Sequence, residues 1–123
     1  MKIILAIGIG SFLGGISRYS LALFIQNKFL SAFPFGTMSV NIIGCFLIGL
    51  VYGLSDRGNI SMEARVFLAT GFLGGFTTFS AFSNDTISML HDGQLWQSFT
   101  YVMCSVGIGL LATFTGISLI KYL

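Results

Sequence analysis

The chain has 123 residues, of which 54% are hydrophobic and only 8% are charged. These proportions exclude a soluble globule of this size, because too few polar side chains are available to cover its surface. The formal net charge of +2 comes from basic residues scattered along the chain, which excludes a nucleic-acid surface. We therefore expect an integral membrane protein that forms a single domain over residues 1–123.

Four apolar stretches are long enough to cross a bilayer as helices. They cover residues 3–25, 37–54, 63–90 and 96–120. The first is too long for the core of a signal peptide, so we expect it to be a retained span. An even number of spans places both termini on one side of the membrane. The predicted fold is all-α, with four transmembrane helices per subunit.

Basic residues near the predicted spans give a small orientation bias. The side of the termini holds Lys2, Arg57, Arg65 and Lys121, and the other side holds Lys28 and, by its position, Arg18. The excess favours cytoplasmic termini. It is small enough that a short chain could insert in either orientation.

Arg18 and Asn41 are the polar residues that stand out in the first two spans. A charge at the depth of Arg18 costs at least about 2.5 kcal/mol on insertion scales, so it should face protein or water, or snorkel to the nearer interface. Asn41 needs hydrogen-bond partners, either by tying two helices together or by lining a wet path.

The spacing of Gly10 and Gly14 predicts close helix packing. Four helices enclose little space, so a sheltered polar path calls for a second copy.

The third span contains the stretch GFLGGFTTFSAFSND, residues 71–85, which has low helix propensity where Gly74 and Gly75 are followed by Thr77 and Thr78. We expect the helix to be broken there, in the middle of the membrane. Irregular backbone at that depth must be buried in protein or line a cavity, so the break predicts a site. Freed carbonyls suit a small cation and the amides of a new helix start suit an anion, and the residues alone leave both open.

Aromatic and hydroxyl side chains follow this predicted break. Phe79 and Phe82 share one helical face, and Ser80 and Ser83 share the neighbouring one. Phenylalanines at this spacing are ordinarily packing residues, but ring edges beside hydroxyl donors could also take up a small anion. The fourth span adds hydroxyls that could bond the preceding turn or join this face, at Tyr101, Ser105, Thr113 and Thr115.

Three motifs together resemble the Fluc fluoride-channel family, also called CrcB. They are GGISRY in the first span, FPFGTMSVN before the second and GFLGGFTTFSAFS in the third, and the resemblance extends over nearly the whole chain. It implies an antiparallel, dual-topology homodimer in the cell membrane, with two pores that pass fluoride passively out of the cytoplasm. It also implies a sodium ion at the dimer centre that is structural and not transported.

The resemblance also assigns site residues around the third helix. The backbone carbonyls of Gly74 and Thr77 would hold the sodium ion, and Asn41 would be an amide donor in the pore. The ring edges of Phe79 and Phe82 would contact fluoride. The remaining polar row of the pore would consist of Ser80, Ser83, Tyr101 and Thr113, while Arg18 would serve structure or the vestibule.

Two places depart from the family pattern. Asn84 and Asp85 stand where many relatives carry a glutamate just after the FS motif, which should alter a helix-end contact more than the pore. Gly109 stands where the pattern has a serine on the fourth helix, so one hydroxyl of the polar row is missing.

The chief alternative is a small four-span multidrug exporter driven by proton exchange. Such an exporter needs a membrane-embedded carboxylate, but the first span has none, and Glu63 and Asp85 fall near the ends of the predicted third span. We do not expect an enzyme, because no nucleophile lies beside a base and there is no pair of histidines or of carboxylates.

Overall fold

A computed structural model describes all of residues 1–123, and every regular element in it is helical. The long helices are α1 (Lys2–Phe29), α2 (Phe35–Asp56) and α6 (Leu95–Tyr122). The third passage consists of α3 (Met62–Arg65), the π-helix η1 (Val66–Leu73), α4 (Gly74–Phe76) and α5 (Phe79–His91). Four segments are long and apolar enough to cross a membrane, Lys2–Phe29, Phe35–Asp56, Met62–His91 and Leu95–Tyr122. The four predicted spans are thus confirmed.

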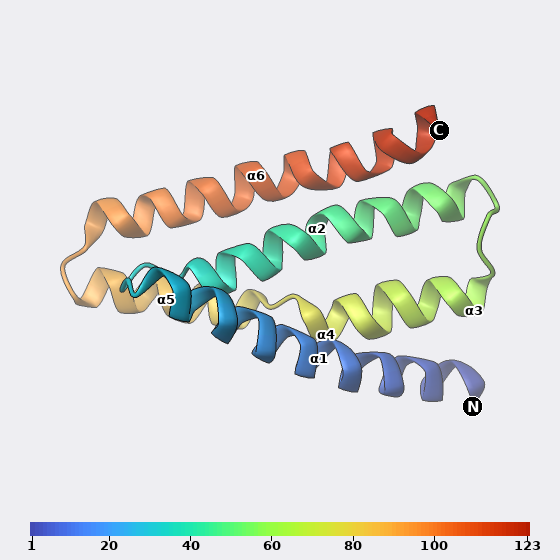
Figure 1. The fold of residues 1–123 in the computed structure, drawn as a ribbon, viewed down its shortest axis with the longest axis horizontal. Coiled ribbons are helices and arrows are strands. Elements are labelled where there is room, and N and C mark those ends of the chain that lie inside the picture. The colour runs from blue at the N-terminus through green and yellow to red at the C-terminus, as the bar shows by residue number, and fades with distance from the viewer.

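The four passages lie side by side in an elongated bundle (Figure 1). α2 lies between α6 on one side and the third passage on the other, and α1 packs mainly against η1. Both termini lie at one end of the bundle, as an even number of spans requires, and the connections α1–α2 and α5–α6 lie at the opposite end. Gly93 makes the turn before α6 with a positive φ of 77°, a conformation that favours glycine.

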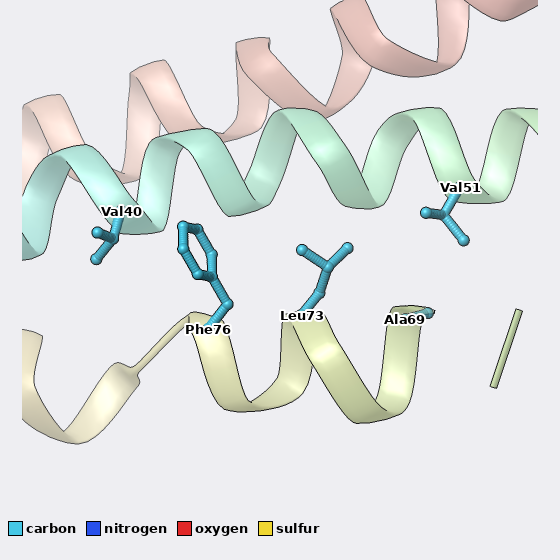
Figure 2. Close-up of a cluster of buried hydrophobic side chains, with 5 residues drawn as sticks. All are labelled: Val40, Val51, Ala69, Leu73 and Phe76. Carbon is cyan, nitrogen blue, oxygen red and sulfur yellow. The ribbon is translucent and has the colours of Figure 1, made fainter. Parts of the chain in front are cut away.

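A small apolar core holds the third passage against α2 (Figure 2). Val40 and Val51 of α2 face Ala69 and Leu73 of η1 and Phe76 of α4. Only 18 of the 123 residues are buried, and large apolar side chains are exposed on every passage. Lipid or another protein surface must therefore cover the outside of the bundle.

Glycines allow α1 to approach the third passage closely. A Cβ atom at Gly10 would lie 2.8 Å from the carbonyl oxygen of Phe67, and one at Gly14 would overlap the carbonyl of Phe72. The close packing predicted from the spacing of these two glycines is confirmed.

Replacing Gly14 with alanine is expected to destabilise the folded protein by about 1–3 kcal/mol, because the backbone of η1 would have to move away from α1. Thermal unfolding in detergent measures this as a lower Tm. Gly8→Ala is the matched control on the same helix, because a Cβ there meets no atom within 4 Å. Equal Tm values for the two variants would contradict the contact.

Candidate functional site

The helical backbone of the third passage is interrupted at Thr77 and Thr78. Both are extended, with φ and ψ of −96° and 157° at Thr77 and of −150° and 120° at Thr78. The Thr78 hydroxyl begins α5 as its N-cap by accepting a hydrogen bond from the amide of Ala81 at 3.1 Å. Gly75 stays helical; a Cβ there would lie 2.5 Å from the carbonyl oxygen of Ser11, so its smallness serves the contact with α1.

Asn41 holds the interruption in place from α2. Its Nδ2 donates to the carbonyl oxygen of Thr78 at 3.0 Å, and its Oδ1 accepts from the amide of the same residue at 2.8 Å. One side chain therefore satisfies both backbone polar groups of an extended residue, much as a neighbouring β-strand would. Asn41 also lines a hollow described below, so it both ties two passages together and faces a cavity.

Two backbone carbonyls lose their ordinary helical donors at the interruption. In a continuous helix the amide of Thr78 would bond the Gly74 carbonyl, but it donates to Asn41 instead. The amide of Ala81 would likewise bond the Thr77 carbonyl, but it donates to the Thr78 hydroxyl. Carbonyl oxygens freed in this way are hard ligands, which suit a small cation.

A hollow of about 310 Å³ lies beside the interruption. No charged side chain lines it. Residues of α2, Asn41 among them, and residues of η1 form part of its lining. The rest comes from the region of the interruption: Gly74, Thr77, Thr78, Phe79 and Phe82. The structure thus brings together five of the residues predicted for the site: Asn41, Gly74, Thr77, Phe79 and Phe82.

An aromatic series continues from this hollow toward α6. The ring centroids of Phe79 and Phe82 are 5.7 Å apart, and those of Phe82 and Tyr101 are 5.1 Å apart. Tyr101 is fully buried, whereas Phe79 is 80% exposed. The Tyr101 hydroxyl donates to Oδ2 of Asp85 at 3.2 Å. Asp85 therefore faces α6 from within α5, and it lies six residues before the third span ends at His91, near the end of that span as predicted.

The predicted hydroxyl residues are more scattered. Ser80 and Ser83 are exposed on α5, and the Ser80 hydroxyl shares a hydrogen bond of 3.1 Å with that of Thr78. Thr113 does not line the hollow; its hydroxyl donates to the carbonyl of Cys45 at 2.9 Å and so ties α6 to α2. Ser105, one turn after Tyr101, carries a buried hydroxyl that has no hydrogen-bond partner.

Arg18 lies at a second hollow, of about 390 Å³, nearer the end of the bundle that carries the α1–α2 connection. Its Nε donates to the carbonyl of Gly75 at 3.2 Å, which links α1 to α4. Gln26, Thr37 and Asp85 also line this hollow. The sequence gives no signal for Gln26, because a glutamine near a helix end is ordinarily a surface residue.

Comparisons with known proteins cover nearly the whole chain. The family model described as "CrcB-like protein, Camphor Resistance (CrcB)" matches residues 5–117. The chain belongs to the CrcB family. Three relatives carry the name "Fluoride-specific ion channel FluC". The one from Rhizobium meliloti (strain 1021) is 45% identical over 98% of both chains, and the one from Flavobacterium psychrophilum is 44% identical over 100% of both. The one from Bacteroides fragilis is 46% identical over 94% of both.

This CrcB-family chain accommodates its unusual residues locally. A Cβ atom at Gly109 would lie 3.3 Å from Sγ of Cys45, so a larger residue there would press on α2. Asp85 reaches Tyr101 directly, while Asn84 is exposed on the outside of α5.

Proposed function

We propose that this protein is a fluoride channel of the plasma membrane that lets fluoride leave the cytoplasm passively and so reduces its toxicity. The near full-length match to relatives named as fluoride-specific ion channels carries the proposal. The geometry fits it, because the hollow beside the interruption has an amide, hydroxyls and ring edges but no fixed charge. Transport by a channel of this kind needs no covalent chemistry, and no enzymatic activity is proposed.

The proposed pore runs past the hollow and along α5 and α6. Fluoride would exchange its water for the Asn41 amide, for the ring edges of Phe79 and Phe82, and then for hydroxyl donors. One hydrogen of the Asn41 Nδ2 remains for this purpose, since the other is donated to Thr78. The polar row would consist of Ser80, Ser83, Tyr101 and Thr113. Tyr101 and Thr113 would first have to release the hydroxyl hydrogens that they donate to Asp85 and to the Cys45 carbonyl. Selectivity over chloride would come from the width of the pore and the placement of its donors.

The proposed assembly is an antiparallel, dual-topology homodimer with two pores. The exposure of Phe79 is compatible with it, because a phenylalanine that is 80% exposed beside a hollow can be covered by a second copy of the chain as well as by lipid. A second copy of the chain is the covering surface that the family implies. The small bias of basic residues along the chain is compatible with insertion in both orientations.

Sodium is proposed as the structural ion of this dimer. The carbonyls of Gly74 and Thr77, whose ordinary donors go elsewhere, would supply two oxygen ligands from each subunit. The ion would supply positive charge that holds the two interruptions together, and it would not be transported.

Removing sodium is expected to lower the thermal stability of the dimer and its fluoride release together, because the four carbonyls would face one another without a cation. Purified protein is exchanged into N-methylglucamine salts, and its Tm and fluoride release are compared before and after sodium is restored. A dimer that is equally stable and equally active without sodium would refute this assignment.

A proton-coupled multidrug exporter was the alternative from the sequence. Asp85 is the observation in its favour, because it is a carboxylate within a membrane-sized segment, although it lies only six residues from the end of that segment at His91. Its hydrogen bond to Tyr101 and its place outside the hollow beside Phe79 do not suit exchange with a cationic drug there. The family match also favours the channel.

Growth of a bacterial strain that lacks its own fluoride export tests the proposed function. Expression of this chain is expected to restore growth in millimolar fluoride and to leave sensitivity to cationic dyes unchanged. A folded, membrane-inserted protein that protects against dyes and not against fluoride would reverse the choice between channel and exporter.

A further inference from the structure

Gln26 of α1 makes most of the side-chain hydrogen bonds that hold the connection between α1 and α2. Its Nε2 donates to the carbonyl oxygens of Ser31 at 2.8 Å and Phe33 at 3.0 Å, and its Oε1 accepts from the amide of Gly36 at 2.9 Å. Two of the bonds go to the backbone of the connection, and the third goes to the first turn of α2. Because each bond holds a different point, Gln26 determines the path of the chain from α1 into α2.

Close packing between the start of α2 and α1 also holds this region in place. A Cβ atom at Gly36 would overlap the carbonyl of Ala22, so the start of α2 lies directly against α1. Ser31 adds a local bond, since its hydroxyl accepts from the amide of Phe33 at 3.1 Å. The amide and the carbonyl of Phe33 are therefore both held, by the side chains of Ser31 and Gln26, and this fixes the position of Phe33.

Phe33 extends the aromatic series that begins at the hollow. Its ring centroid lies 5.6 Å from that of Tyr101, with an interplanar angle of 86°, which is the edge-to-face arrangement that aromatic pairs favour. Tyr101 in turn lies 5.1 Å from Phe82. A continuous series of rings thus connects the α1–α2 connection to Phe79 at the hollow.

Tyr101 is held at three points, and only two of them come from α5. Phe82 contacts the ring and Asp85 accepts from the hydroxyl, while the ring of Phe33 contacts it from the connection. Tyr101 is fully buried, so loss of the Phe33 ring would leave space into which its own ring could turn. Such a turn would change both its hydroxyl position and its contact with Phe82.

We propose that Phe33, fixed by Gln26, is a positioning residue that holds Tyr101 against Phe82, so that the α1–α2 connection sets the geometry of the fluoride path. This inference rests on the proposed channel function. Phe33 itself need not touch fluoride, because it acts through Tyr101.

The test combines a spectroscopic signal with fluoride release. The four tyrosines are replaced biosynthetically by 3-fluorotyrosine, and the fluorine-19 resonance of Tyr101 is identified as the one lost in Tyr101→Phe. Phe33→Leu should shift this resonance and lower fluoride release from liposomes by about three- to tenfold, the factor that one aromatic contact represents. Phe33→Tyr keeps the ring, so it should restore fluoride release and return the Tyr101 resonance to its original position, with one additional resonance from the new tyrosine.

Gln26→Leu provides a second variant that leaves every aromatic ring in place. It should shift the same resonance and lower fluoride release, because the connection that carries Phe33 is no longer held. Gln97→Leu is the matched control, since Gln97 is exposed at the same end of the bundle, lines one hollow with Phe33 and makes no side-chain hydrogen bond, so it removes an amide near Phe33 without releasing the connection. Phe99→Leu is the control for loss of a ring, because Phe99 is 56% exposed and contacts only Trp96 among the aromatic residues.

An unmoved Tyr101 resonance in both Phe33→Leu and Gln26→Leu would overturn the inference, as would full fluoride release in both. Equal losses in Phe99→Leu would also overturn it, because any ring at this end would then serve. A wild-type protein that releases no fluoride would instead overturn the proposed function and the part of the inference about the fluoride path. The resonance would still show whether Phe33 positions Tyr101.

Discussion

Replacing Phe82 with isoleucine is expected to lower fluoride release from liposomes by about tenfold or more and to leave the assembly of the proposed dimer intact. The ring of Phe82 lies between those of Phe79 and Tyr101 and also lines the hollow, so it is the centre of the proposed path. Isoleucine fills a similar volume but has no ring edge for an anion. An increase of ~1.4 kcal/mol in the free-energy barrier to fluoride passage corresponds to a tenfold slower rate.

Phe12→Ile is the matched control for this variant. Phe12 lies on α1, is 67% exposed and makes no contact with another aromatic ring, so its replacement should leave release unchanged. Gel filtration of all three proteins checks that each remains the same oligomer. Undiminished release from a folded Phe82→Ile protein would remove the phenylalanine rings from the mechanism.

Replacing Asn41 with aspartate is expected to abolish most fluoride release and to destabilise the fold by about 2–4 kcal/mol. The aspartate keeps the acceptor for the Thr78 amide but places a carboxylate oxygen beside the Thr78 carbonyl, where Nδ2 now donates. An unpaired buried polar group costs about 1–3 kcal/mol, and repulsion between the two oxygens adds to this cost. The new negative charge would also repel fluoride in the hollow.

Measurement of Tm and fluoride release on the same Asn41→Asp sample distinguishes these two effects. Asn59→Asp is the control, because Asn59 is exposed in the connection before α3 and its side chain holds no other residue. A drop in release without a drop in Tm would assign Asn41 to the pore alone. Normal Tm and normal release would contradict both its clamping and its conducting role.

The composition and the spacing of apolar residues were enough to predict the four helical spans. Apolar length is a local property, and the bundle confirms it from Lys2 to Tyr122. The close approach of α1 was also predictable, because Gly10 and Gly14 recur at one-turn spacing. The run Val66–Leu73 gave no sign of a π-helix in the sequence, and in the structure this segment packs against α1 and α2.

The residues near the interruption were predictable, but their partners were not. Low helix propensity marked the stretch from Gly74 to Thr78, and the structure places the extended backbone at the two threonines. The bonds from Asn41 to Thr78 join residues 37 positions apart, so no local sequence pattern predicts them. The hydrogen bond from Thr113 to the Cys45 carbonyl joins residues 68 positions apart and could not be predicted from the sequence either.

Release of fluoride from liposomes tests the central claim most directly. Purified protein is reconstituted in liposomes loaded with potassium fluoride, a potassium ionophore is added to release the counter-charge, and external fluoride is recorded with a selective electrode. We expect rapid release of fluoride without any imposed pH gradient, and negligible release when the liposomes are loaded with chloride. Folded protein that releases no fluoride, or that releases chloride equally fast, would contradict a selective fluoride channel.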